Sequence, residues 1–171
     1  RYINTSIIGE YSLAGSIFLD HRNKKDFSDF NSIIHGHHMD ESAMFGDLDK
    51  YIDEDFFNDH PYGNLYYDGS DHGVEFFAYM LADAYDWTLY NPAISSSEET
   101  QEAYLTYLLS NALYTRDIGV STDDRIILLS TCATESTNGR YILIGRLTDE
   151  QYKDTFQAEP GDSIWNRVGS Q

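Results

Sequence analysis

The sequence predicts a mainly β fold with inserted helices, first because short β-rich segments occur toward both ends of the chain. Gly15–Asp20 and Asn31–Gly36 have the length of strands and are separated by the charged segment HRNKKDFSDF. Two further apolar runs, Asp124–Thr131 and Arg140–Leu147, flank the polar loop CATESTNG. The turn sequence GSDHG lies between two aromatic-rich runs in the middle of the chain and predicts a β-hairpin there.

Two segments show helical periodicity and predict the inserted helices. Apolar residues recur at helical spacing over Met44–Ile52, and a His-Pro pair closes that segment. The clearest helix begins at a cap on Ser96 or Ser97 and extends to Arg116, with glutamates in its first turns to complement the helix dipole. Its predicted apolar face consists of Tyr104, Leu105, Leu108, Leu109, Ala112 and Leu113.

Length and charge limit the class of protein and its partners. A chain of 171 residues is large enough for one core and small for two. The 29 acidic and 11 basic residues give a formal charge of −18, which argues against binding to nucleic acid or to anionic lipid. No apolar run reaches the roughly 18 residues that a membrane-spanning helix needs. The chain starts at Arg1 rather than at a methionine, so it says nothing about targeting signals.

The chain contains one cysteine, Cys132, at the point where an apolar strand meets a loop. One interpretation is a small buried apolar side chain, which is the usual fate of a free cysteine. The other is a nucleophile that a rigid strand end holds in a fixed direction. A nucleophilic thiol needs a base, and three of the six histidines cluster in IIHGHHMD, again where a strand gives way to a loop. These histidines could equally form a metal patch or be ordinary loop residues.

Arg140 opens the strand that follows the cysteine loop. If the two strands are antiparallel neighbours, Cys132 and Arg140 lie side by side at one end of the pair. A guanidinium there can stabilise a thiolate or the oxyanion of a tetrahedral intermediate, and it keeps its charge at every working pH. The alternative is a strand-end arginine paired with a surface carboxylate of this acidic protein.

With LLSTC, the following Arg140 and the upstream IIHGHHM, the sequence resembles the sortases, and class B in particular. The helical segment after the histidines and the long helix Glu98–Arg116 ahead of the cysteine strand are similar to that class. The resemblance implies a sortase-type closed β-barrel with a long helix before the cysteine strand. It implies a single catalytic domain over residues 1–171, with a core over about 15–147 and a C-terminal tail over 148–171.

The resemblance also implies roles for individual residues. The family's histidine directly follows a glycine, which selects His37; the nucleophile corresponds to Cys132 and the arginine to Arg140. Ser130 and Thr131 match the pair that lines the binding groove in class B enzymes. A characterised class B sortase has an acidic residue directly after the cysteine, where this chain has Ala133.

The activity that the resemblance implies is that of a cysteine transpeptidase without cofactor or metal. Such an enzyme cleaves a sorting motif after threonine through a thioacyl intermediate and transfers the protein to an amine, either of peptidoglycan or of a pilin lysine. The expected location is the outer face of a Gram-positive cell membrane, with an anchor ahead of Arg1. The alternative is a non-enzymatic β-rich extracellular binding module with a histidine metal patch.

Overall fold

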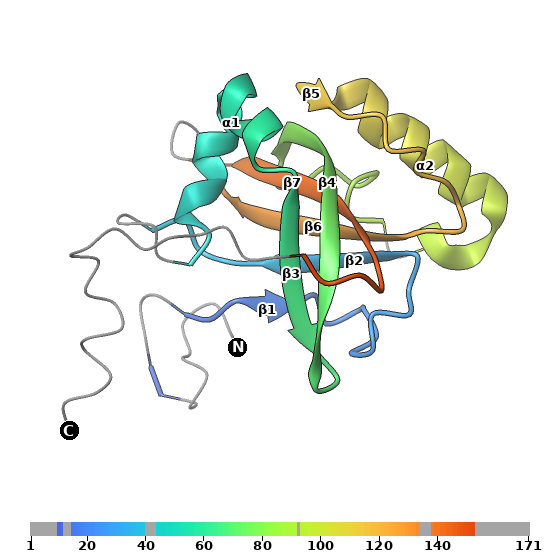
Figure 1. Cartoon of the computed structure of the whole chain (residues 1–171), viewed down its shortest axis with the longest axis horizontal. Coiled ribbons are helices and arrows are strands. Elements are labelled where there is room, and N and C mark those ends of the chain that lie inside the picture. Colours follow the sequence, from blue (N-terminus) through green and yellow to red (C-terminus); the bar gives the residue numbers. More distant parts are fainter. Residues whose placement is uncertain (1–9, 12–14, 40–43, 92, 134–137, 153–171) are drawn as a thin grey trace.

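The computed structural model describes residues 10–11, 15–39, 44–91, 93–133 and 138–152 of the chain. Seven strands form one sheet in the order β1–β2–β6–β7–β4–β3, with β5 paired to β4 (Figure 1). The strands are β1 (Phe18–Leu19), β2 (Asn31–His35), β3 (Tyr62–Tyr67), β4 (Ser70–Asp83), β5 (Tyr114–Thr115), β6 (Arg125–Cys132) and β7 (Gly139–Leu147).

One parallel pair lies within this otherwise antiparallel sheet. β2 runs parallel to β6, and His35 is opposite Ser130 in their register. β6 is antiparallel to β7, and their register ends with Cys132 opposite Arg140. The ends of β2 and β6 and the start of β7 therefore lie at one edge of the sheet. All four predicted strands near the chain's two ends are present, although the first is reduced from Gly15–Asp20 to two residues.

The sheet bends along β4, the longest strand. Ser70–Glu75 pairs with β3, whereas Val74–Asp83 pairs with β7 across an irregularity between Phe76 and Ala78. Figure 1 shows β3 lying across the direction of β2 and β6. Among the described residues the edge strands β1 and β3 do not pair, so the expected closed barrel is an open, bent sheet. The two paired residues of β1 offer too short an edge for closure.

The central hairpin is present, but its turn is tighter than predicted. Asp68 and Gly69 connect β3 to β4 with φ values of 49° and 81°. Two consecutive residues of positive φ form the turn that matches the twist of hairpin strands, and glycine adopts it without strain. Ser70–Gly73, which the sequence analysis placed in the turn, belongs to β4 instead.

The segment after the histidines is helical but divided. A 3₁₀ helix, η2, covers Gly46–Ile52, and the α-helix α1 covers Glu54–Asp59. Asp53 separates them in an extended conformation, and its carboxylate accepts hydrogen bonds from the backbone amides of Asp55 and Phe56. An aspartate with this geometry starts a new helix rather than continuing the old one.

The long helix α2 (Glu98–Asn111) follows a short 3₁₀ helix, η3 (Ile94–Ser96), and begins as predicted. Ser97 and Thr100 form a reciprocal capping box. The predicted end at Arg116 is wrong. After the helix, the amides of Leu113 and Arg116 donate to the carbonyl oxygens of Tyr79 and Phe77, so this segment follows β4.

Two apolar clusters cover the sheet, one on each face, as the alternation along its strands requires. Ile126 and Leu128 of β6 belong to the cluster that contains Tyr104, Leu105 and Leu108 of α2. Ile127 of β6 belongs to the cluster beneath η2 and α1. Leu109 and Leu113, predicted for the apolar face of the helix, are exposed. Within the described ranges, no helix is both long and apolar enough to cross a membrane.

Candidate active site

Cys132 is the last residue of β6, and its side chain is exposed to solvent. The amide of Ala133 donates to the carbonyl oxygen of Gly139, which closes the β6–β7 ladder just beyond the cysteine. Cys132 and Arg140 are direct cross-strand partners. Such partners point to the same face with their Cβ atoms about 4.5–5.5 Å apart. The thiol and the guanidinium are therefore neighbours at the sheet edge.

The backbone brings His37 to the same edge. The amide of Gly36 donates to the carbonyl oxygen of Ser130 at 3.1 Å, which extends the β2–β6 pairing by one bond. The register ends at His35 and Ser130; His37 lies two residues beyond His35, as Cys132 lies two beyond Ser130, and both line the same groove. The amide of Phe45 donates to the carbonyl oxygen of His37 at 3.0 Å and fixes the start of the loop.

The other two histidines of the cluster contact separate carboxylates. Nε2 of His35 lies 3.1 Å from Oδ2 of Asp20, and Nε2 of His38 lies 3.0 Å from Oδ2 of Asp49 in η2. In the part of the chain that the structure describes, no group of His, Cys, Asp and Glu side chains could hold a metal ion. The HGHH sequence thus presents its histidines in different directions and gives no support to a metal patch.

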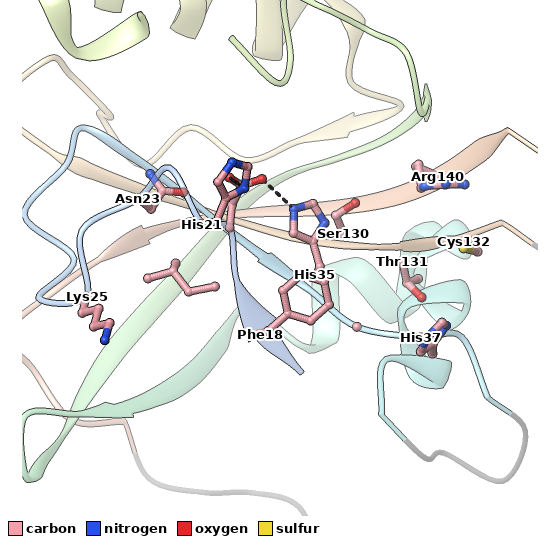
Figure 2. A pocket seen from close by; sticks show the side chains of 13 residues that line it. Phe18, His21, Asn23, Lys25, His35, His37, Ser130, Thr131, Cys132 and Arg140 are labelled. Carbon is pink, nitrogen blue, oxygen red and sulfur yellow. Dashed lines mark hydrogen bonds and ion pairs between the residues drawn. The ribbon is translucent and has the colours of Figure 1, made fainter. Parts of the chain in front are cut away.

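A groove of about 970 Å³ connects the candidate residues (Figure 2). At one end it is lined by all five residues singled out from the sequence: His37, Ser130, Thr131, Cys132 and Arg140. From there it extends past His35 to Phe18 and Lys25. This elongated hollow has a nucleophile, an imidazole and a guanidinium at one end, an arrangement suited to acyl transfer on an extended ligand.

The two residues before the cysteine are buried beneath the groove. Ser130 and Thr131 are each 2% exposed. Oγ1 of Thr131 has no hydrogen-bond partner among the described residues. A buried hydroxyl is costly to leave unpaired, and this oxygen lies beneath the groove without access to it. Oγ of Ser130 lies 3.1 Å from the hydroxyl of Tyr90.

No protein-family model matches the chain. The solved sortase B from the type II pilus of Streptococcus pneumoniae is 51% identical, with a TM-score of 0.74, over 80% of this chain and 78% of that chain. This chain belongs to the class B sortases. A Streptococcus pyogenes class B sortase involved in pilus biogenesis is 37% identical, with a TM-score of 0.76, over 85% of this chain and 78% of that one.

Sortase B of Listeria monocytogenes is 39% identical over 151 residues, which is 85% of this chain and 59% of that protein. The chain therefore spans about three fifths of the length of the curated relatives it matches. The expected class B resemblance and the mainly β fold with inserted helices are confirmed by these sortases.

Tyr90, in the segment between β4 and α2, does not line the groove of this sortase, but its hydroxyl contacts Ser130, which does. Burial raises the pKa of Tyr90, against the effects of its hydrogen bond with Ser130 and of the Arg140 charge. The chain has 14 tyrosines, and Tyr90 lies in a segment without a helix or strand pattern. Only the folded structure shows that it is the tyrosine that contacts Ser130.

Gly36 leaves room for the Phe45 ring of this sortase just beyond the end of β2. A Cβ atom at this position would lie 2.6 Å from the Phe45 ring. We expect Gly36→Ala to lower the free energy of unfolding by about 1–3 kcal/mol, the usual cost of overpacking. Urea denaturation measures this loss. Adding Phe45→Leu, which removes the ring, should restore part of it, and an unchanged stability in Gly36→Ala would contradict the close contact.

Proposed function

We propose that this chain is a cysteine transpeptidase that cleaves a sorting motif after threonine and joins the new carboxyl end to an amine. The observation that carries the proposal is the groove in which an exposed strand-end thiol shares one end with His37 and Arg140. Membership of the class B sortases supports the same activity.

In the first half of the proposed reaction, the Cys132 thiolate attacks the carbonyl carbon of the motif threonine. Arg140, the cross-strand partner of the cysteine, stabilises the negative charge that develops on the carbonyl oxygen. The bond from threonine to the next residue then breaks, and imidazolium His37 gives its proton to the leaving amine. The product is a thioester between the threonine and Cys132.

In the second half, the acceptor amine loses a proton to neutral His37 and attacks the thioester carbonyl. The new amide bond forms as the Cys132 thiolate leaves, which restores the starting enzyme. Ser130 and Thr131 bind the peptide in this proposal. The observation that supports a substrate contact there is that both residues line the groove beside Cys132.

For the acceptor we propose a pilin lysine rather than a peptidoglycan amine. The likeness to the Streptococcus pneumoniae and Streptococcus pyogenes pilus enzymes, at 51% and 37% identity, favours this choice. A pilus sortase works on the outer face of the cell membrane, and we place this chain there. The rival binding module requires a metal patch, which the described residues do not form.

Mass spectrometry of the intact protein tests the proposal. The chain is incubated with peptides of the Leu-Pro-x-Thr-Gly and Asn-Pro-x-Thr types, and a thioester adduct on Cys132 is expected for one of them. Adding purified pilins should then give ladders of covalent polymers on denaturing gels, whereas wall peptides should give single products. The absence of any adduct while Cys132 reacts freely with iodoacetamide would overturn the transpeptidase proposal.

A further inference from the structure

The carboxylate of Asp20, directly after β1, is a buried charged group that the proposed reaction does not use. Asp20 is 8% exposed. Its Oδ1 accepts from the backbone amide and from Nε of Arg22 at 3.0 and 2.8 Å, and its Oδ2 accepts from Nη2 of Arg22 at 2.9 Å. Burial opposes ionisation, but these bonds and the one with His35 outweigh it and hold the pKa of Asp20 well below its usual range.

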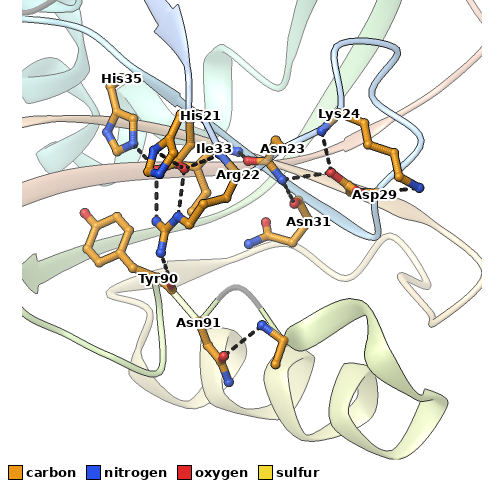
Figure 3. Close-up of polar contacts among 12 residues, drawn as sticks. His21, Arg22, Asn23, Lys24, Asp29, Asn31, Ile33, His35, Tyr90 and Asn91 are labelled. Atoms are coloured by element: carbon orange, nitrogen blue, oxygen red, sulfur yellow. Dashed lines mark hydrogen bonds and ion pairs between the residues drawn. The ribbon is translucent and has the colours of Figure 1, made fainter. Parts of the chain in front are cut away.

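The guanidinium of Arg22 connects this carboxylate to a distant segment of the chain. Nε and Nη2 form the two-pronged contact with Asp20, and Nη1 donates to the carbonyl oxygen of Tyr90 at 2.9 Å (Figure 3). A planar group with donors on three nitrogens makes both contacts at once, which an ammonium group cannot do in the same geometry. The main chain of Tyr90 is therefore tied to the end of β1.

His35 ties the side chain of the same tyrosine to the same carboxylate. Nε2 of His35 lies 3.1 Å from Oδ2 of Asp20, while its ring lies over the Tyr90 ring with 6.3 Å between centroids and 25° between planes. Tyr90 is thus held twice, at its carbonyl oxygen and at its ring. The tyrosine hydroxyl lies 3.1 Å from Oγ of Ser130, two residues before the cysteine.

The segment that carries Tyr90 has further anchors, at Asp86, whose carboxylate accepts from the Tyr107 hydroxyl of α2, and at Leu89. Leu89 is fully buried, and its carbonyl oxygen accepts from the Tyr104 hydroxyl of α2 at 2.7 Å. In contrast, Tyr85 and Trp87 are 80% and 70% exposed. Removing the contacts of Arg22 therefore leaves the rest of the segment anchored and takes from Tyr90 only the hydrogen bond to its carbonyl oxygen, so the effect on the site can be separated from an effect on the fold.

We propose that Asp20, Arg22 and His35 form a clamp that positions Tyr90 against Ser130 and thereby sets the affinity of the groove for its peptide. The three are positioning residues rather than groups that touch the reacting atoms; Arg22 does not line the groove and acts through Tyr90, whereas Asp20 and His35 also line it. The inference rests on the proposed transpeptidase function for its kinetic consequence. The structural effect of the clamp, which is to hold the segment 84–91 in place, does not depend on that function.

The test compares Arg22→Lys with Arg125→Lys. The two arginine side chains are equally exposed, at 34%, and Arg125 lies at the far end of β6, where it contacts Asp149 and Tyr67. With the best cleaved peptide, Arg22→Lys should raise KM about tenfold, the effect of losing one hydrogen bond to a charged group. Its kcat should stay within about twofold of the parent, and Arg125→Lys should change neither constant.

A double-mutant cycle separates positioning from a general structural role. If Arg22 acts through Tyr90, Arg22→Lys should have no further effect on KM in a Tyr90→Ala background. The clamp would be overturned if the two substitutions raised KM by factors that multiply in the double variant. A lowered kcat with an unchanged KM in Arg22→Lys would also overturn it.

Hydrogen–deuterium exchange keeps the inference testable if no peptide is cleaved. Amides of residues 88–91 should exchange faster in Arg22→Lys than in the parent, and at the parental rate in Arg125→Lys. A parent chain that turns over no peptide refutes the proposed function, whereas unchanged exchange in Arg22→Lys refutes the clamp.

Discussion

Replacement of Cys132 with alanine is expected to reduce transpeptidation by at least about ten-thousand-fold, the size of effect seen when a covalent nucleophile is removed. The reason is that no other group in the chain can form the thioester, since this is the only cysteine in the sequence. Release of a fluorophore from a quenched sorting peptide measures the rate, and intact-mass analysis should show no acyl adduct on the variant.

Alkylation supplies the control for this variant. Because Cys132 is exposed, iodoacetamide should label the native parent at one site, and the labelled enzyme should lose activity in step with labelling. Unchanged melting temperature in Cys132→Ala would show that the loss is chemical. A variant that retains the parental rate would refute the nucleophile, and labelling that requires unfolding would favour the rival binding module.

Replacement of Arg140 with alanine is expected to lower kcat/KM by at least about 100-fold, the loss that follows removal of an oxyanion donor. Arg140 has the geometry for this role because it is opposite Cys132 in the β6–β7 register. Its Nη1 also donates to the carbonyl oxygen of Gly139 at 2.7 Å, which orients the guanidinium beside the thiol. Progress curves with the same quenched peptide measure the effect.

Two further variants make this result specific. Arg140→Lys keeps the positive charge but loses the planar fork, so its activity should fall between those of the parent and the alanine variant. Arg125→Ala removes a half-buried guanidinium from the other end of the same strand pair and should leave kcat/KM nearly unchanged. Parental activity in Arg140→Ala would show that oxyanion stabilisation does not involve this residue.

Local sequence signals predicted those parts of the fold that local chemistry determines. The Ser97 cap and the apolar stretches of β6 and β7 are examples, and each was located from a few neighbouring residues. The errors have tertiary causes. Arg116 looked like a helix end, but pairing with β4 draws its backbone away from α2. The single helix expected after the histidines divides because Asp53 caps a second one.

The candidate site likewise contains some residues that the sequence indicated and some contacts that only the folded chain shows. The strand ends, and with them Cys132 and Arg140, could be found from sequence because their spacing describes one strand–loop–strand unit. The choice of His37 among its neighbours came from the family resemblance, and the folded chain adds that His35 and His38 contact other carboxylates. The contacts of Arg22 with Tyr90 join positions 68 residues apart, so no local pattern could indicate them.

The parallel pairing of β2 with β6 makes the chemistry depend on the completion of folding. The histidine loop is synthesised early and the thiol late, and most of the domain lies between them. Parallel pairing across such a separation forms slowly, because a long connection must be ordered before the strands gain their contacts. A nascent or partly refolded chain therefore carries a thiol with no histidine beside it. Recovered activity during refolding would report the moment at which the two halves of the sheet join.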